Sequence, residues 1–176
     1  MLGLGNSLMG GTVLGWTPAE IPSIIHWYRK GVGQTSSDGV SNTNCDLWTD
    51  QKGSNNLTAD GSDGYSPTLN ADGTITFDAN SDLMTFGSSL DLGTFSFYVR
   101  LNYASTIGTD YLFEEGTSDY LQLSSKALVK VKIDGQGRHD YVISPALPED
   151  GTPFNVGFER EDTGGAGDTD DVIRVY

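Results

Sequence analysis

The second half of the chain alternates apolar and polar residues with a period of two. Residues 94–102 carry their apolar side chains at every other position, namely Phe95, Phe97, Val99 and Leu101. The same alternation recurs at residues 129–133 and 154–158. Because successive side chains of a strand point to opposite faces, this pattern is typical of strands half-buried in an antiparallel sheet.

Further short apolar runs indicate more strands, each bounded by turn residues. They lie at residues 24–29, 111–113, 120–123, 141–143 and 172–176. Glycine and aspartate separate the later runs, and these residues favour turns. Residues 17–20 have the form of a helix-capping box, but Pro22 limits any helix there to one short turn. The sequence therefore predicts an all-β protein, an antiparallel β-sandwich, with no long helix.

Two segments depart from this pattern. Residues 31–73 are rich in polar and turn residues, and we expect ordered surface loops with one or two short strands. Residues 1–16 alternate glycine with apolar residues, which predicts either a frayed terminus, a first strand on the domain's own core, or an arm that binds a neighbouring subunit. We expect an extended arm over 1–16 and one domain over 17–176. The candidate partner-binding residues of the arm are Leu2, Leu4, Leu8, Met9, Val13 and Leu14.

Charge and composition exclude several function classes. The 176 residues include 10 Lys and Arg against 24 Asp and Glu, a net charge of −14, which argues against nucleic acid or an anionic membrane surface as partner. No apolar run reaches the roughly 20 residues that a membrane span needs. Cys45 is the only cysteine, so the chain has no internal disulfide. No basic residue precedes Arg29, so we expect no secretory signal.

The order of several motifs resembles a known family. Trp27-Tyr28 is followed by an Asp-, Gly- and Asn-rich segment at 46–57, then by Ser66-Pro67, by an acidic turn at 75–84 and by the strand at 94–99. This order is similar to that of the concanavalin A-like lectin and glucanase (LamG-like) jelly rolls. The resemblance implies a jelly-roll β-sandwich over most of the chain. Ala79 stands where the family has glycine, and the chain ends where the family continues with further strands. Either the jelly roll is abbreviated or a partner chain covers its last edge, and we favour the covered edge because an uncovered edge promotes aggregation.

The first residues, together with such a domain, resemble small virion structural proteins of marine tailed bacteriophages. The resemblance implies a non-enzymatic capsid decoration or tail and neck component, attached through residues 1–16 and assembled in the host cytoplasm. Its partners are then other virion proteins, in a homo-oligomer or a multi-subunit assembly. The alternative is a lectin-like module that binds host-surface glycans.

Catalytic groups are sparse. Glu159 and Glu161 share one face of a strand, as the paired carboxylates of glucanases do, but the Glu-x-Asp-x-Glu pattern of those enzymes is absent. We expect the two glutamates to lie on a solvated face and the protein not to be an enzyme. Cys45 is expected to be buried and inert, His26 to be packed beside Trp27, and His139 to lie at the surface.

Two binding hypotheses remain from the sequence. Asp78, Asn80 and Asp82 match the first three ligands of a calcium loop, but Leu83 replaces its required glycine, so the alternative is that these side chains close their own turn. We expect no cofactor, with Ca²⁺ as the one candidate metal. The candidate sugar-contacting residues are tyrosines near loops, namely Tyr65, Tyr103, Tyr111 and Tyr120.

Overall fold

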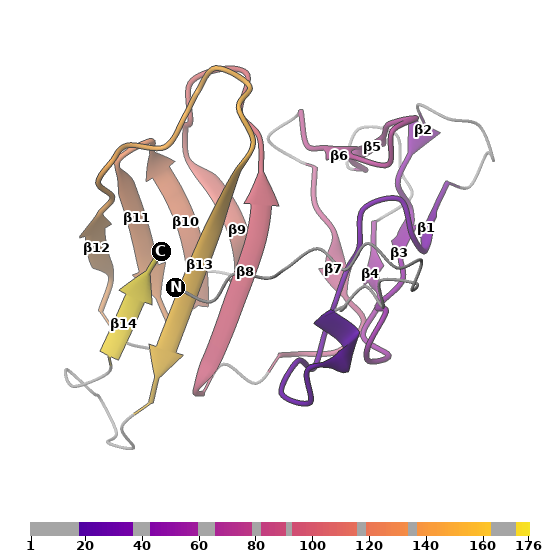
Figure 1. Cartoon of the computed structure of the whole chain (residues 1–176), viewed down its shortest axis with the longest axis horizontal. Coiled ribbons are helices and arrows are strands. Elements are labelled where there is room, and N and C mark those ends of the chain that lie inside the picture. The colour runs from indigo at the N-terminus through magenta and orange to yellow at the C-terminus, as the bar shows by residue number, and fades with distance from the viewer. Residues whose placement is uncertain are drawn as a thin grey trace, which may run out of the picture. The chain divides into compact units, whose positions relative to one another are not determined.

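The computed structural model describes residues 18–36, 43–59, 66–78, 82–90, 93–115, 119–133, 137–162 and 172–176. Within these residues the chain forms one short 3₁₀ turn and strands alone, and every strand pairing is antiparallel. The all-β prediction is therefore confirmed (Figure 1). The elements are η1 (Pro18–Glu20), β1 (Gln34–Thr35), β2 (Thr43–Asn44), β3 (Leu47–Trp48), β4 (Leu57–Thr58), β5 (Thr68–Leu69), β6 (Ile75–Thr76), β7 (Thr85–Phe86), β8 (Phe95–Leu101), β9 (Asp110–Glu115), β10 (Asp119–Ser125), β11 (Leu128–Lys132), β12 (His139–Val142), β13 (Phe154–Glu161) and β14 (Val172–Val175).

The chain divides into two compact units, Met1–Leu90 and Asp91–Tyr176. The second unit contains the long strands, arranged in two sheets of order β12-β11-β10-β9 and β14-β13-β8. Strands β9 to β12 follow one another as a meander, and the chain then returns to place β13 between β8 and β14. Figure 1 shows these sheets as two layers, so this unit is a small sandwich in itself.

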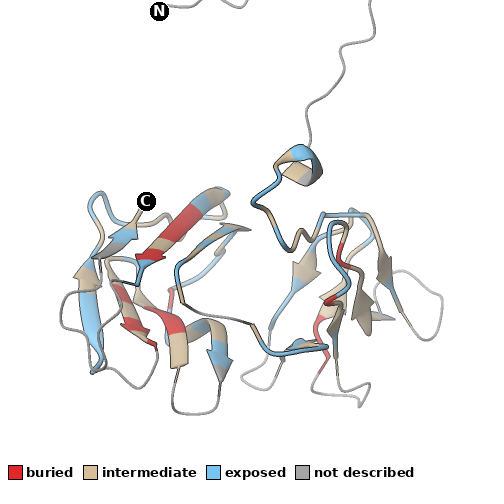
Figure 2. Ribbon diagram, turned by 90° about the horizontal axis from the view of Figure 1, so that it is seen from below, coloured by how far each residue is buried: buried red, intermediate tan, exposed pale blue. Residues whose placement is uncertain are grey.

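The hydrophobic core of the second unit lies between its two sheets. Leu121, Leu123, Val129 and Val131 come from one sheet and Phe158 from the other, and each is at most 1% exposed. Figure 2 shows the buried segments on strands of both sheets. Burial of one such side chain stabilises the fold by about 1.5–3 kcal/mol. The apolar alternation of the sequence therefore faces inward, as predicted.

The first unit is built differently, from sheets of order β1-β3-β4-β7 and β2-β5-β6 whose strands are only two residues long. The prediction of one or two short strands between residues 31 and 73 was wrong, because β1 to β5 all lie there. A strand of two residues is too short to show an alternation of apolar and polar residues in the sequence. Cys45 and Pro67 are fully buried apolar side chains of this unit, and polar Asp50, Asn55 and Ser66 are buried with them.

The predicted strand at 24–29 was also wrong. This segment belongs to no sheet, because its backbone groups bond to a loop instead: Trp27 N donates to Asp50 Oδ1 over 3.0 Å, and Trp27 O accepts from Gln51 N over 2.7 Å. The single turn predicted at 17–20 is confirmed as η1. Residues 1–17 lie outside the described residues, so the arm stays a prediction, and so does one domain over 17–176.

Candidate functional site

The outer face of the β14-β13-β8 sheet carries two exposed tyrosines in one row. Phe97 on β8 and Phe158 on β13 contact the core. Successive residues of a strand face opposite sides of the sheet, so the neighbouring positions Tyr98 and Gly157 face outward. Tyr98 on β8 pairs with Gly157 on β13, and Gly157 and Tyr176 exchange backbone hydrogen bonds of 3.2 and 2.9 Å. Tyr98, Gly157 and Tyr176 therefore lie side by side across three adjacent chain segments.

A carboxylate joins the two rings. The hydroxyl of Tyr98 donates to Glu159 Oε1 over 2.6 Å, and the hydroxyl of Tyr176 donates to Oε2 over 3.0 Å. Both tyrosines stay accessible, at 65% and 64% exposed. The hydroxyls of Tyr98 and Tyr176 lower the pKa of Glu159, and the carboxylate in turn raises the pKa of both tyrosines. At neutral pH the carboxylate is ionised and both hydroxyls keep their protons.

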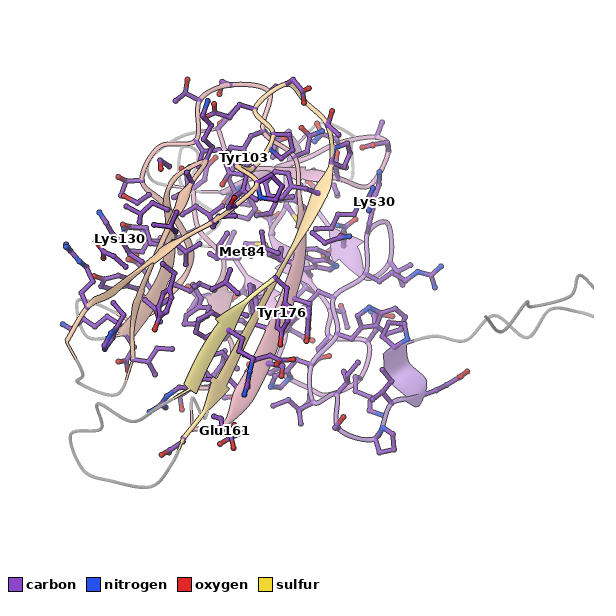
Figure 3. The ribbon with its side chains drawn as sticks, turned by 60° about the vertical axis from the view of Figure 1, so that its left-hand side comes forward. Lys30, Met84, Tyr103, Lys130, Glu161 and Tyr176 are labelled. Atoms are coloured by element: carbon purple, nitrogen blue, oxygen red, sulfur yellow. The ribbon has the colours of Figure 1, made fainter. Side chains whose placement is uncertain are left out.

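Gly157 is the reason why the Tyr98 ring can lie against the sheet. A Cβ at position 157 would stand 2.6 Å from Tyr98 Cε1 and 2.8 Å from its Cδ1, closer than carbon atoms approach. The missing side chain therefore leaves room for the ring over β13. We call this surface, formed by Tyr98, Gly157, Glu159 and Tyr176, the tyrosine face; Figure 3 labels Tyr176 on it.

Polar side chains of both charges surround the tyrosine face. Arg100 pairs with Asn155 across β8 and β13, and Arg174 pairs with Glu159 across β13 and β14. Arg174 Nη2 also lies 3.7 Å from Glu161 Oε2. The two arginines and the two glutamates balance in charge, so the face offers many hydrogen-bond donors and acceptors without a net charge.

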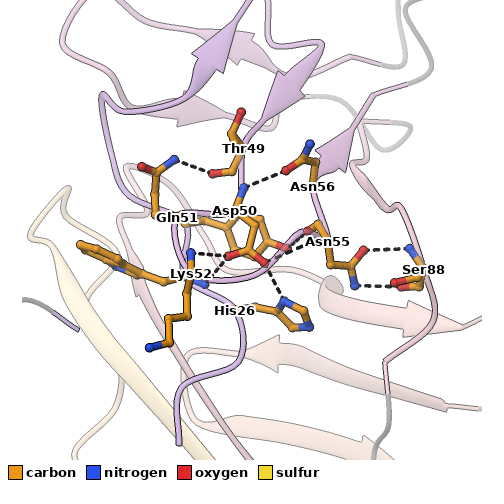
Figure 4. A network of polar contacts seen from close by, with 10 residues as sticks. His26, Thr49, Asp50, Gln51, Lys52, Asn55, Asn56 and Ser88 are labelled. Atoms are coloured by element: carbon orange, nitrogen blue, oxygen red, sulfur yellow. Dashed lines mark hydrogen bonds and ion pairs between the residues drawn. The ribbon is translucent and has the colours of Figure 1, made fainter. Parts of the chain in front are cut away.

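The first unit holds a second polar cluster, centred on the Asp50 carboxylate (Figure 4). Oδ1 accepts from the backbone N of Trp27 and of Lys52, both over 3.0 Å. Oδ2 accepts from His26 Nδ1 over 2.7 Å and from Asn55 N over 3.3 Å. The Asp50 side chain is 0% exposed, so these donors replace the water it loses on folding.

The Asp50 cluster holds chain segments of the first unit together. Burial by itself raises the pKa of Asp50, but hydrogen bonds from Gly53 N, Trp27 N, His26 and Lys52 N outweigh burial and hold the pKa well below its usual range. Both oxygens are occupied, which leaves no position for a ligand. The same loop reaches a third segment through Asn55, whose side chain exchanges hydrogen bonds of 3.0 and 2.8 Å with the Ser88 backbone.

The candidate sugar-contacting tyrosines separate in the structure. Tyr111 and Tyr120 meet edge to face on β9 and β10, with ring centroids 5.7 Å apart. Tyr103 instead packs against the core and stacks on Phe154, and burial raises its pKa to about 12. Its ring packs partly buried against the core, and its role as a sugar contact stays a prediction. Tyr65 lies outside the described residues.

The candidate metal residues close a turn. Asp82 Oδ2 accepts from the backbone N of Asp78 over 2.9 Å, as the alternative interpretation of this motif expects. Asn80 lies outside the described residues. Among the residues that the structure describes, no three His, Cys, Asp or Glu side chains form a group that could hold a metal ion. Calcium binding stays a prediction.

Cys45 and His26 are both held within the first unit. Cys45 is fully buried, and burial raises the pKa of its thiol to about 11, as expected of an inert cysteine. His26 is bound to Asp50. The arm residues lie outside the described residues; they are Leu2, Leu4, Leu8, Met9, Val13 and Leu14.

No motif in the sequence marks Tyr98 and Tyr176 as a site. The two tyrosines are 78 positions apart along the chain, and only the strand pairing brings both hydroxyls to Glu159. The one available signal was the polar face of residues 94–102, which contains Tyr98.

The chain shows no match to any known family model, to any curated protein or to any solved structure. In the described part of the chain, no helix is long and apolar enough to cross a membrane.

Proposed function

We propose that this protein is a non-enzymatic carbohydrate-binding module that binds a neutral glycan on the tyrosine face. The observation that carries the proposal is the pair of exposed rings of Tyr98 and Tyr176, both fixed by Glu159. Sugar rings stack their C–H faces on aromatic side chains, and their hydroxyls bond to polar groups beside the rings.

The rigidity of the face favours binding. A free tyrosine loses rotamer freedom when a ligand immobilises it, which costs about 0.5–1.5 kcal/mol per side chain. Tyr98 and Tyr176 are already held by their hydrogen bonds to Glu159, so the ligand does not have to order them. A carboxylate has about four acceptor sites. Glu159 therefore keeps acceptor capacity for sugar hydroxyls, and Asn155 and Arg100 supply donors.

The charge balance of the face sets the ligand class. Arg100, Arg174, Glu159 and Glu161 cancel in formal charge, so neither an anion nor a cation gains long-range attraction there. A neutral polyhydroxylated ligand uses donors and acceptors of both signs without burying an unpaired charge. The lowered pKa of Glu159 does not suit it as a general acid, which agrees with a binding role.

A glycan array followed by isothermal titration calorimetry tests the proposal. We expect the full chain to bind neutral oligosaccharides and Tyr98→Ala or Tyr176→Ala to weaken binding at least about fivefold, which corresponds to about 1 kcal/mol. Glu159→Gln keeps the shape of the side chain but weakens its bonds to both hydroxyls, so we expect a smaller loss. Phe77→Ala, which removes an exposed aromatic side chain of the first unit, is the matched control. A blank array, or equal losses in the control, would reject the tyrosine face as the site.

The expectation of a virion structural protein depends on residues 1–16 and on the resemblance described above. It stays a prediction, because residues 1–16 lie outside the described residues. The two roles are compatible, since a protein that decorates a virion can also bind sugars.

A further inference from the structure

We infer that the opposite sheet of the second unit carries a second binding site, for an oligosaccharide that bears a carboxylate. The site is the outer face of β12-β11-β10-β9, which we call the lysine face. It differs from the tyrosine face in sheet, residues and ligand charge. The lysine face does not depend on the proposed neutral-glycan site.

The strand register arranges the lysine face. Leu121 and Val131 point into the core, so the residues next to them on β10 and β11 point outward. The pairing places the outward side chains in two rows: Tyr111, Gln122, Lys130 and Asp140 in one, and Glu114, Tyr120 and Lys132 in the other. Lys130 projects away from the sheet that carries Tyr176 and Glu161 (Figure 3).

The aromatic part of the face is fixed in place. The Tyr111 and Tyr120 rings meet at 87°, and Tyr111 remains 48% exposed. Gln122 also points outward from the sheet, yet it is only 4% exposed, so neighbouring side chains cover it. Tyr111 therefore presents a supported ring on which a sugar can stack.

Positive charge sits in the middle of the sheet. Lys130 and Lys132 are two residues apart on the same face of β11, which separates their backbones by about 7 Å. Asp140 is the neighbour of Lys130 in its row, but its carboxylate is 2.9 Å from Arg138 Nε, and the two form an ion pair. Glu114 lies two strands from Lys132.

These charges set the ligand class. A chain with a net charge of −14 repels anions, so binding an anionic ligand requires a local cationic group such as this one. Tyr111 and Lys130 are two strand spacings apart, about 10 Å. A ligand that stacks on Tyr111 and places a carboxylate on Lys130 must span that distance, which favours an oligosaccharide over a single sugar.

Calorimetry with oligogalacturonate, and with the same oligomer methyl-esterified to remove its charge, tests this inference. We expect the full chain to bind the acid form, and to bind the ester about tenfold more weakly, the value of one charge-assisted hydrogen bond. Lys130→Gln should weaken the binding of oligogalacturonate by the same factor of about ten. Tyr111→Ala should weaken it clearly as well. Lys130→Arg should keep most of the affinity, which shows that the fold is intact.

Two controls separate the possible failures. Lys52→Gln removes the same charge in the first unit and should leave oligogalacturonate binding unchanged. Tyr98→Ala should also leave it unchanged, while weakening the binding of neutral glycans. The inference is overturned if the wild type does not bind oligogalacturonate, if acid and ester bind equally, or if Lys52→Gln costs as much as Lys130→Gln. Loss of oligogalacturonate binding in Tyr98→Ala would move the anionic ligand to the tyrosine face and also overturn it.

Discussion

At the scale of single residues, buried polar groups determine how the first unit is held together. Asp50 lies where a small domain usually has an apolar side chain, and it joins residues 26–27 to the loop that contains Lys52 and Asn55. A buried group without its partners costs about 1–3 kcal/mol. The unit therefore depends on one carboxylate in its ionised form.

This dependence predicts a change in stability with pH. The pKa of Asp50 is lower in the folded than in the unfolded chain, where it is near 3.9. Its stabilising contribution is therefore complete above about pH 4 and is lost as the pH falls towards the folded pKa. Asp50→Asn directs an amide at backbone donors, so we expect it to lower the free energy of unfolding by about 3 kcal/mol at pH 7.

Urea unfolding of the wild type and Asp50→Asn between pH 2 and 7 measures this difference. The difference in the free energy of unfolding between the two proteins should be constant above about pH 4 and should shrink below it. Glu20→Gln is the matched control, since Glu20 is an exposed carboxylate in η1 of the same unit. A gap that stays constant down to the lowest pH would contradict the role of the Asp50 carboxylate.

At the scale of elements, the alternation along each strand decides which side chains face outward, and the pairing of strands decides which of them meet. Residues 94–102 predicted β8 (Phe95–Leu101) within a residue at each end, because alternation is a local property. The segment at 24–29 has strand-like composition but no strand partner, and its bonds go to the Asp50 loop. Composition cannot specify a partner that is distant in sequence.

The row that crosses β8 and β13 makes a specific prediction for Gly157. In Gly157→Ala the new methyl group would stand 2.6 Å from the Tyr98 ring, which must swing away. Tyr98 is an exposed side chain that can move, so we expect the free energy of unfolding to change by less than about 1 kcal/mol. Neutral-glycan binding should fall at least about fivefold, because the ring leaves the face.

Calorimetry and urea unfolding of the same variant check both parts. Gly108→Ala is the control, because a Cβ there meets no atom within 4 Å. If Gly157→Ala binds as the wild type does, the position of the Tyr98 ring over β13 is not needed for binding.

At the scale of the whole molecule, the core cluster lies entirely within the second unit. Seven strands in two sheets bury it, and every pairing of those strands is made within Asp91–Tyr176. We therefore expect residues 91–176 expressed alone to fold cooperatively and to keep both binding faces. Circular dichroism measures the strand content of this fragment, thermal unfolding its cooperativity, and nuclear magnetic resonance its folded structure. A fragment with strand content but no cooperative transition would show that the second unit needs the first.

The sequence by itself determined the all-β class, the strands of the second unit and the inward apolar positions, since each follows from alternation within a few residues. It also indicated outward positions for Tyr98 and Glu159. Only the tertiary structure decided that Tyr98 and Tyr176 share Glu159, across separations of 61 and 17 residues, and that Tyr111 and Lys130 share one row. Strand order and register depend on contacts distant along the chain, and local patterns do not encode them.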